Sequence, residues 1–236
     1  MRLVGHAGLG RARPAGAPDA ASITGAGARG VTALELDVAA CADALLVMHD
    51  TVVGGRAVAG MTLASLRSRL PDLLTLDEAV EAAAGLDLLL LDLKGDAVTE
   101  PLGRWLHARG DNRLAVCTDD MSALLALRHA SPTTPRWRTL PWVGEGPGRR
   151  MRTAAAVIGR RRLPAALPLL AREVAATGIC VDHLVLTRPL VERAHALGLL
   201  VDVWTVNDPA AARRARSLEV DLLTTDHPEA VTPVVG

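Results

Sequence analysis

Residues 33–50 read ALELDVAACADALLVMHD, and this stretch decides which fold the chain can adopt. It holds two apolar, strand-like runs, Ala33–Val38 and Leu45–Met48, which are separated by only six residues. A parallel crossover needs about a dozen residues or more, so the two runs must pair as an antiparallel hairpin. The second run is therefore an addition to any parallel sheet that the rest of the chain builds.

Strand-like and helix-like patterns alternate along the remainder of the chain. The other expected strands are Arg2–Gly5, Leu88–Leu93, Leu114–Cys117, Thr139–Val143, Ile179–Val185, Leu200–Val206 and Leu222–Thr225. The expected helices are Thr62–Arg69, Leu76–Ala84, Glu100–Arg109, Met121–Ala130, Met151–Arg160 or Pro168–Thr177, Arg188–Leu197 and Pro209–Leu218. Thr75–Glu78 and Asn207–Pro209 have the polar cap and the first-turn acid or proline that are typical of helix starts.

Eight strands remain when the hairpin strand is set aside, over a length of 236 residues. This number and length predict an α/β fold, a (β/α)8 TIM barrel, with one extra antiparallel hairpin strand after strand two. No linker rich in Pro, Gly or Ser divides the chain, and the Pro132–Arg152 stretch is interpreted as a long loop. Residues 1–236 are therefore expected to form a single domain.

The composition excludes several classes of protein. The chain has 26 basic and 26 acidic residues, and a net charge of zero argues against a nucleic-acid partner, because phosphate neutralisation needs a basic surplus. Three cysteines, an odd number without metal-ligand spacing, indicate a reducing compartment. No stretch resembles a signal peptide or a membrane span, so we expect a cytoplasmic protein without stable membrane insertion.

Polar side chains gather at the carboxyl ends of the expected strands, where TIM barrels carry their active sites. Glu35 and Asp37 are two residues apart, so both point to the same face of their strand. Asp92 and Lys94 repeat this spacing, and Lys94 is the single lysine of the chain, beside 25 arginines. The ends of three further strands carry His6, Trp204, Asn207 and Asp226.

The hairpin adds a histidine to this set. If its turn centres on Asp43, Asp37 lies opposite His49, and an imidazole stands next to the acidic pair. Carboxylates that lie close together repel each other unless a cation sits between them, and hard oxygen ligands suit Mg²⁺ or Ca²⁺. Two histidines could then serve as general acid and base, and a lysine would balance a phosphate-bearing substrate. The set predicts metal-assisted cleavage of a phosphodiester.

Six segments, in this order, resemble motifs of the glycerophosphodiester phosphodiesterase family. Their family counterparts read H-R-G, A-P-E-N-T, I-E-x-D-V with V-x-H-D, I-E-x-K, W-T-V-N and I-T-D-x-P. In this chain they are Val4–Gly8, Ala17–Ser22, Leu34–Val38 with Val47–Asp50, Leu91–Lys94, Val203–Asn207 and Leu223–Pro228. The resemblance runs along the whole chain.

This resemblance implies hydrolysis of a small-molecule glycerophosphodiester to glycerol 3-phosphate and an alcohol, with a divalent metal. Carried over position by position, His6 and His49 would be the acid/base pair. The metal would be held by Glu35, Asp37 and Asp92. The phosphate would be contacted by Lys94, and the substrate pocket would be lined by Trp204.

Some positions depart from the family pattern. The arginine that follows the first histidine in the family is Ala7 here, so a phosphate contact is missing. Asp19 and Ala20 stand where the A-P-E-N-T segment of the family has Glu and Asn. The third metal ligand is shortened from Glu to Asp92. Two alternatives therefore stay open. One is a weakened or inactive barrel that binds phosphodiester or phospholipid head groups, and the other is a relative that acts on lysophospholipid head groups.

Overall fold

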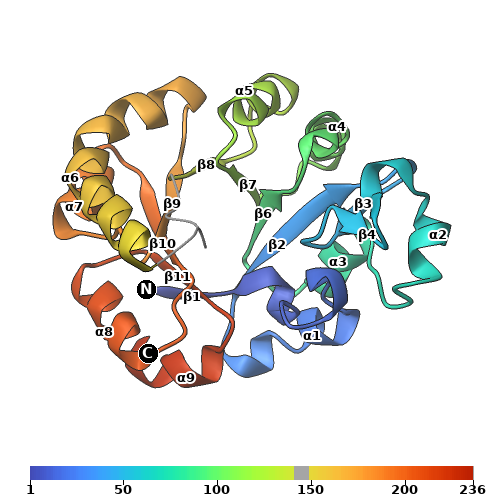
Figure 1. The fold of residues 1–236 in the computed structure, drawn as a ribbon, viewed down its shortest axis with the longest axis horizontal. Coiled ribbons are helices and arrows are strands. Elements are labelled where there is room, and N and C mark those ends of the chain that lie inside the picture. Colours follow the sequence, from blue (N-terminus) through green and yellow to red (C-terminus); the bar gives the residue numbers. More distant parts are fainter. Residues whose placement is uncertain (141–148, 236) are drawn as a thin grey trace.

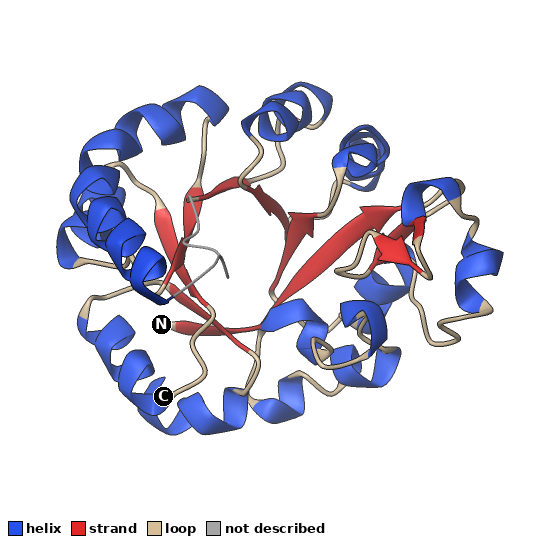
Figure 2. Cartoon of the chain, viewed as in Figure 1, coloured by secondary structure: helices blue, strands red, loops and turns tan. Residues whose placement is uncertain are grey.

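Eight parallel strands close into a barrel, because β1 pairs with β2 on one side and with β11 on the other (Figure 2). The computed structural model describes residues 1–140 and 149–235, with the backbone alone for 149–155. The predicted TIM barrel is confirmed. Its strands are β1 (Arg2–Gly5), β2 (Ala33–Ala40), β6 (Leu88–Leu93), β7 (Leu114–Thr118), β8 (Arg136–Thr139), β9 (Gly178–Asp182), β10 (Leu200–Trp204) and β11 (Leu222–Thr225).

Helices surround the barrel as an outer ring (Figure 1). The α-helices are α1 (Ala20–Thr24), α2 (Leu63–Arg67), α3 (Leu76–Ala82), α4 (Thr99–Arg109), α5 (Met121–Ala130), α6 (Arg149–Val174), α7 (Arg188–Ala196), α8 (Pro209–Ser217) and α9 (Pro228–Val235). Short 3-10 turns are η1 (His6–Leu9), η2 (Pro14–Gly16), η3 (Gly27–Arg29), η4 (Val58–Gly60) and η5 (Asp96–Val98). Both predicted helix starts are confirmed, since Thr75 and Glu78 form a reciprocal capping box and Asp208 caps α8.

The predicted hairpin strand is β3 (Leu45–Val47), which pairs antiparallel with β2 outside the barrel. Its register places Val38 opposite Val47, so Asp37 faces Met48, whose N–H donates to the Asp37 carbonyl at 2.9 Å. The expected pairing of Asp37 with His49 was wrong by one residue. The reason is the turn, which spans residues 41–44 and does not centre on Asp43.

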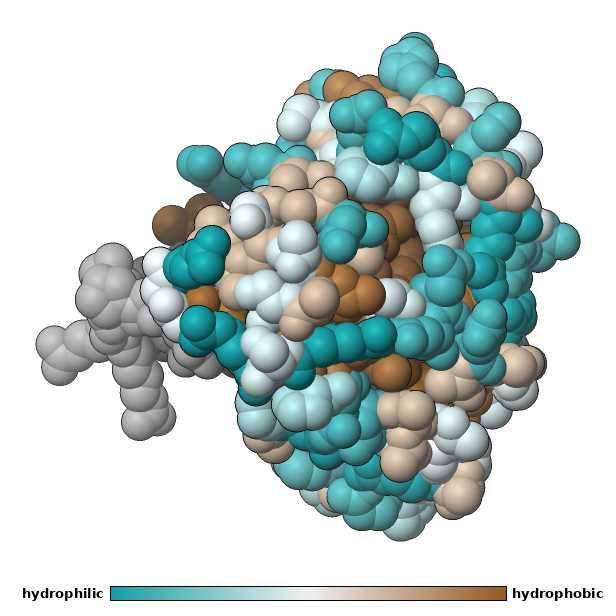
Figure 3. Space-filling model, turned by 90° about the vertical axis from the view of Figure 1, so that its right-hand side faces the viewer, coloured by the Kyte–Doolittle hydropathy of each residue, from teal (hydrophilic) through white to brown (hydrophobic). Residues whose placement is uncertain are grey.

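A second, smaller hairpin follows, formed by β4 (Val52–Val53) and β5 (Arg56–Ala57). Gly54 and Gly55 fill its two-residue turn with φ angles of +58° and +75°. Two consecutive positive φ angles are what the tightest hairpin turns require, and glycine adopts them without steric cost. On this side of the molecule the surface is mainly hydrophilic, and hydrophobic residues form small separate patches (Figure 3).

The fifth barrel strand begins earlier than predicted. The expected strand was Thr139–Val143, of which residues 141–143 lie outside the described residues, whereas β8 covers positions assigned to the Pro132–Arg152 loop. Two arginines conceal the strand in the sequence, because Arg136 and Arg138 are only 7% and 8% exposed. They alternate with Trp137, which packs inside the barrel. The arginine side chains lie on the outer face of the strand, where the guanidinium of Arg136 donates to backbone carbonyls.

The two alternative helices Met151–Arg160 and Pro168–Thr177 belong to one helix, α6, which continues through Pro164 and Pro168. Its described apolar residues recur every three or four positions across both prolines and are buried against the strands. This burial outweighs the backbone hydrogen bonds that the prolines remove. In the described part of the chain, no helix combines the length and hydropathy needed to cross a bilayer.

Side chains of β2 point alternately toward the helices and into the barrel, and this alternation separates the hydrophobic core from the functional site. Leu34, Leu36 and Val38 pack outward against the helices, in the apolar layer that also holds α3 and α4. Glu35 and Asp37 therefore point into the barrel, since successive side chains of a strand face opposite sides. The barrel interior carries only a small apolar cluster near its base, which includes Val4, Leu90 and Trp137 in the described residues. The space above that cluster is available for a functional site.

Candidate active site

A cavity of about 820 Å³ opens at the carboxyl ends of the barrel strands. Ligand sites in TIM barrels occupy this end. All seven side chains that the sequence singled out line this one cavity: His6, Glu35, Asp37, His49, Asp92, Lys94 and Trp204. They come from segments spread over almost 200 residues of sequence, so only the closed barrel brings them together.

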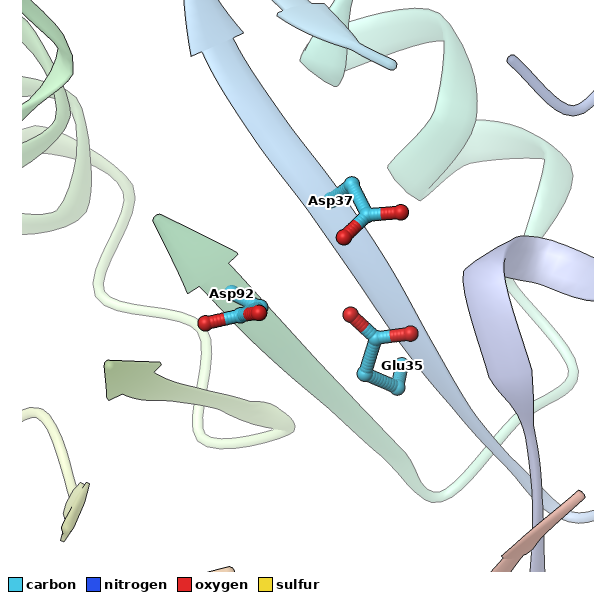
Figure 4. A group of neighbouring side chains, drawn as sticks. All are labelled: Glu35, Asp37 and Asp92. Atoms are coloured by element: carbon cyan, nitrogen blue, oxygen red, sulfur yellow. The ribbon is translucent and has the colours of Figure 1, made fainter. Parts of the chain in front are cut away.

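Three carboxylates form the inner part of the site (Figure 4). Glu35 and Asp37 lie on β2, and Asp92 lies directly beside Asp37 in the register of β2 with β6. One oxygen from each carboxylate lies within 4.8 Å of the corresponding oxygens of the other two. Asp92 reaches this group although its side chain is one methylene shorter than a glutamate.

The single lysine stands among these carboxylates. The ammonium Nζ of Lys94 is 2.9 Å from Oδ1 of Asp37 and 2.5 Å from Oδ2 of Asp92. Burial disfavours the charged ammonium, but the negative charges of Asp92, Asp37 and Glu35 outweigh it and raise the pKa of Lys94. The lysine therefore stays protonated, and its two close ion pairs are made with the carboxylates.

One ammonium does not balance the two buried carboxylates and the half-buried Asp92. Burial and the charges of Asp37 and Asp92 raise the pKa of Glu35 to about 8. Burial likewise raises the pKa of Asp92, although Lys94 acts in the opposite direction. Oδ2 of Asp37 is buried and has no hydrogen-bond partner. A buried carboxylate oxygen without a donor, beside two further carboxylates, is the arrangement that a hard divalent cation satisfies.

His6 is held by a chain of hydrogen bonds at the end of β1. Its Nδ1 donates to Oδ1 of Asp226 at 2.7 Å, and the other oxygen of Asp226 accepts from the side-chain amide of Asn207 at 2.7 Å. With Nδ1 engaged, Nε2 lies 3.9 Å from Oε2 of Glu35. The same glutamate oxygen accepts the backbone N–H of Ala7 at 2.7 Å. The imidazole is thus oriented toward the acidic group.

The surroundings of His6 favour its charged form. Burial alone would lower its pKa, but the hydrogen bond to Asp226 and the charges of Glu35, Asp226 and Asp37 raise the pKa of His6 to about 9. The pair is mutual, because the hydrogen bond and charge of His6 hold the pKa of Asp226 below its usual value despite burial. A protonated imidazole at neutral pH can donate a proton to a developing alkoxide.

His49 reaches the cavity from the hairpin and has a different setting. Its backbone N–H donates to the carbonyl of Ala15 at 3.1 Å, and its Nδ1 lies 3.1 Å from Oδ1 of Asp50. Its side chain is 36% exposed, against 21% for His6. The two imidazoles therefore line one cavity with unequal contact to solvent.

Trp204 lies at the end of β10, partly exposed, between the cavity and the apolar cluster inside the barrel. Its indole gives the cavity an apolar surface opposite the carboxylates. The sequence had assigned Trp204 to the substrate pocket, and the geometry places it where it could contact the organic part of a ligand.

The sequence alone assigned no role to several residues of the site. Asp226 was noticed as a strand end, but its contact with His6 spans 220 residues and has no local signal. Asn207, which donates to Asp226, was likewise noticed only as a strand end. Asp202 precedes Trp204 by two residues on β10 and shares its face of the strand. Its carboxylate accepts a hydrogen bond from Oγ1 of Thr224 at 2.9 Å. Its position between Val201 and Val203 was the available signal, because a polar residue there must face inward. The cavity is further lined by Arg11, Thr51, Cys117, Asp119, Thr139 and Cys180.

Comparison with known proteins agrees with this fold. A phosphodiesterase of Oleispira antarctica, solved with the product sn-glycerol-3-phosphate, is 18% identical and matches with a TM-score of 0.76 over 100% of this chain and 96% of that chain. A glycerophosphodiester phosphodiesterase of Agrobacterium tumefaciens is 21% identical, with a TM-score of 0.75 over 99% and 100%. That of Thermotoga maritima is 17% identical, with a TM-score of 0.72 over 97% and 96%. At such identities the likeness establishes the fold.

The family of the chain follows from a match of its sequence to a family model. No curated protein matches the chain. The model of the glycerophosphoryl diester phosphodiesterase family matches residues 91–230, which is more than half of the chain and includes Asp92, Lys94, Trp204 and Asp226. The chain therefore belongs to the glycerophosphoryl diester phosphodiesterase family, a family of phosphoric diester hydrolases.

Proposed function

We propose that the chain acts as one barrel domain that hydrolyses glycerophosphodiesters to glycerol 3-phosphate and an alcohol, by metal-dependent histidine acid/base catalysis. The observation that carries the proposal is the convergence of three carboxylates, two of them buried and one half-buried, with two imidazoles in one cavity. Neither group suffices alone, because buried acids also occur in structural clusters and single histidines are common at strand ends.

Glu35, Asp37 and Asp92 would hold a divalent metal, either Mg²⁺ or Ca²⁺. The fit rests on the partnerless oxygen of Asp37 and on the raised pKa of Glu35, which both indicate that a positive charge is missing from the site. Oxygen donors of this kind are the ones that these hard cations prefer. When bound, the metal supplies positive charge to the phosphoryl oxygens as the reaction proceeds. Lys94 holds Asp37 and Asp92 in place by its two ion pairs.

His6 and His49 would move the protons. One imidazole removes a proton from the attacking hydroxyl group, and the other donates a proton to the alcohol oxygen as its bond to phosphorus breaks. The raised pKa of His6 suits the donor, since its proton is held at neutral pH. His49 is more exposed and has no buried carboxylate partner in the described residues, so we assign it the role of accepting the proton of the attacking hydroxyl group. Trp204 would cover the organic part of the substrate.

A metal titration tests the metal-dependent hydrolase. Protein stripped with EDTA is assayed with glycerophosphocholine before and after addition of Mg²⁺, Mn²⁺ or Ca²⁺. We expect activity only with a metal, and weaker metal binding in Glu35→Gln, because a carboxylate ligand is lost. Full activity in the stripped protein would contradict metal dependence. A folded protein that is inactive with every metal but still binds glycerol 3-phosphate would be a binding barrel.

The histidine roles need separate variants. His6→Ala and His49→Ala should each reduce kcat/KM by at least about 100-fold, the usual contribution of a lost acid or base. His107→Ala is the matched control, because His107 is exposed on the outer helix α4. Circular dichroism and thermal melting confirm that each variant is folded. Retained activity in either cavity variant would remove that histidine from the mechanism.

A further inference from the structure

The cavity holds more negative than positive side chains, and this imbalance affects any phosphate ligand. Among the described residues, its lining contains two permanently cationic side chains, Lys94 and Arg11. Lys94 is engaged by Asp37 and Asp92. The lining carboxylates are Glu35, Asp37, Asp92, Asp119, Asp202 and Asp226. A phosphate group that enters this cavity therefore needs a further positive charge on its outer side.

Position 7 cannot provide that charge. Ala7 follows His6 directly, and it has neither charge nor exposure. Its backbone has a φ of +47°, and its N–H donates to Glu35. The residue is thus fixed within the wall beneath the carboxylates and presents no polar side chain to the cavity.

Arg11 stands at the rim of the same cavity. It occupies the second position of a turn closed by the N–H of Arg13 and the carbonyl of Gly10 at 2.8 Å. Such a turn projects its central side chains outward. Arg11 is exposed and lines the cavity, and among the described residues no carboxylate lies within 4.0 Å of its guanidinium and no hydrogen bond to it is formed. Arg13, two residues later, is instead paired with Asp19 and Asp72.

Gly16 brings this guanidinium close to His49. Its φ is +59°, and a Cβ built on it would lie 2.8 Å from Cβ of His49 and 3.1 Å from Nη1 of Arg11. A larger residue at position 16 would push the two side chains away. The absence of a side chain there leaves room for the arginine to stand beside the more exposed imidazole.

We propose that Arg11 is the phosphate-binding arginine of this site and supplies the positive charge that the alanine at position 7 does not. A guanidinium offers a planar pair of donors that matches two phosphate oxygens, and it keeps its charge at every pH of interest. The ligand is a phosphate monoester or diester whose inner oxygens face the carboxylate group and whose outer oxygens face Arg11. The inference rests on the proposed function for the identity of the diester, but the phosphate contact itself can be measured without turnover.

Calorimetric titration with glycerol 3-phosphate and with inorganic phosphate, in the presence of Mg²⁺, tests this contact. Arg11→Ala should bind both probes about 10- to 100-fold more weakly, the effect of one lost charge-assisted hydrogen-bond pair. Arg11→Lys should recover part of the affinity, because it keeps the charge but not the fork. Free guanidinium ion should restore binding in Arg11→Ala.

Arg13→Ala is the matched control, since it removes the same charge from the same loop but from outside the cavity. Its affinity for both probes should stay within about twofold of the original protein, because the charge of Arg13 is already paired with Asp19 and Asp72 and the remainder is screened by salt. Thermal melting of all variants excludes loss of fold.

The outcomes separate the two proposals. Equal affinity in Arg11→Ala and the original protein would overturn the role of Arg11 even if glycerophosphocholine is hydrolysed. Weakened binding in Arg11→Ala would support it even if no diester is turned over, in which case only the proposed hydrolysis fails. An original protein that binds neither probe would overturn the Arg11 inference as well.

Discussion

Two strands of this barrel, β2 and β8, each bury a pair of charged residues at alternate positions, with opposite consequences. Glu35 and Asp37 point into the barrel, whereas Arg136 and Arg138 lie on its outer face. The guanidinium of Arg136 donates to the carbonyls of Thr134 and Val174, so its charge is solvated by the backbone. The carboxylates instead lie within 4.8 Å of each other and of Asp92, side by side in the wall of the cavity. Burial of charge by itself is therefore no sign of function, whereas the crowding of carboxylates within 4.8 Å of one another, without enough positive charge between them, is.

The strongest test of this comparison is removal of one carboxylate. Asp37→Asn should lower kcat/KM about 1000-fold or more, because it removes a charged group from the site where positive charge must be held. The free energy of unfolding should change little, because the relieved repulsion with Glu35 and Asp92 offsets the lost ion pair with Lys94. Steady-state assays and urea denaturation measure the two effects.

Arg136→Met is the opposite control on β8. It should cost about 2 to 4 kcal/mol of stability, because buried carbonyls lose a charged donor, while the activity per folded molecule is retained. A large loss of activity in folded Arg136→Met, or unfolding of Asp37→Asn, would remove the distinction between the two strands.

A smaller effect is expected from the carboxylate that orients His6. Asp226→Asn keeps a hydrogen-bond acceptor but loses the negative charge, so kcat/KM should fall about 10- to 100-fold. Since Asp226 raises the pKa of His6, the alkaline limb of the variant's pH-rate profile should move to lower pH. A pH-rate profile measures both changes.

The control is Asp221→Asn, which alters an equivalent carboxylate–imidazole pair with His195 on the outside of the barrel. It should leave the profile unchanged. If both variants behave alike, the charge near His6 does not set its protonation during the reaction.

The last effect concerns stability alone and involves Asp202, a buried acid in the wall of the cavity. Burial raises the pKa of Asp202 to about 7, although the bond from Thr224 acts against this. The folded protein therefore binds a proton that the unfolded chain releases above pH 4, and this acid makes folding less favourable as pH rises toward 7. The penalty is constant above that value.

Asp202→Asn removes the titration while its side chain still accepts from Thr224. Its gain in stability over the original protein should grow by roughly 2 to 3 kcal/mol between about pH 5 and pH 8. Urea denaturation at both pH values measures this difference. A gain that is the same at both values would show that Asp202 keeps an ordinary pKa in the folded state.

The sequence predicted local features well. The bounds of β6 and β11 and of α5 are those expected from apolar runs and turn residues, and the period of two on β2 predicted that Glu35 and Asp37 share a face. It failed on β8, because Arg136 and Arg138 interrupt the apolar pattern that marks a strand. Their burial becomes understandable only with the carbonyls that receive their hydrogen bonds.

By itself the sequence determined the number of barrel strands, the hairpin, and which side chains stand at the strand ends. These depend on spacing and polarity within short segments, so they can be inferred locally. Only the tertiary structure decided that Asp37 faces Met48, that Asp226 holds His6 and that Arg11 stands beside His49. These contacts join distant segments, and their electrostatics follow from burial and from distances between charges, neither of which a spacing in the sequence specifies.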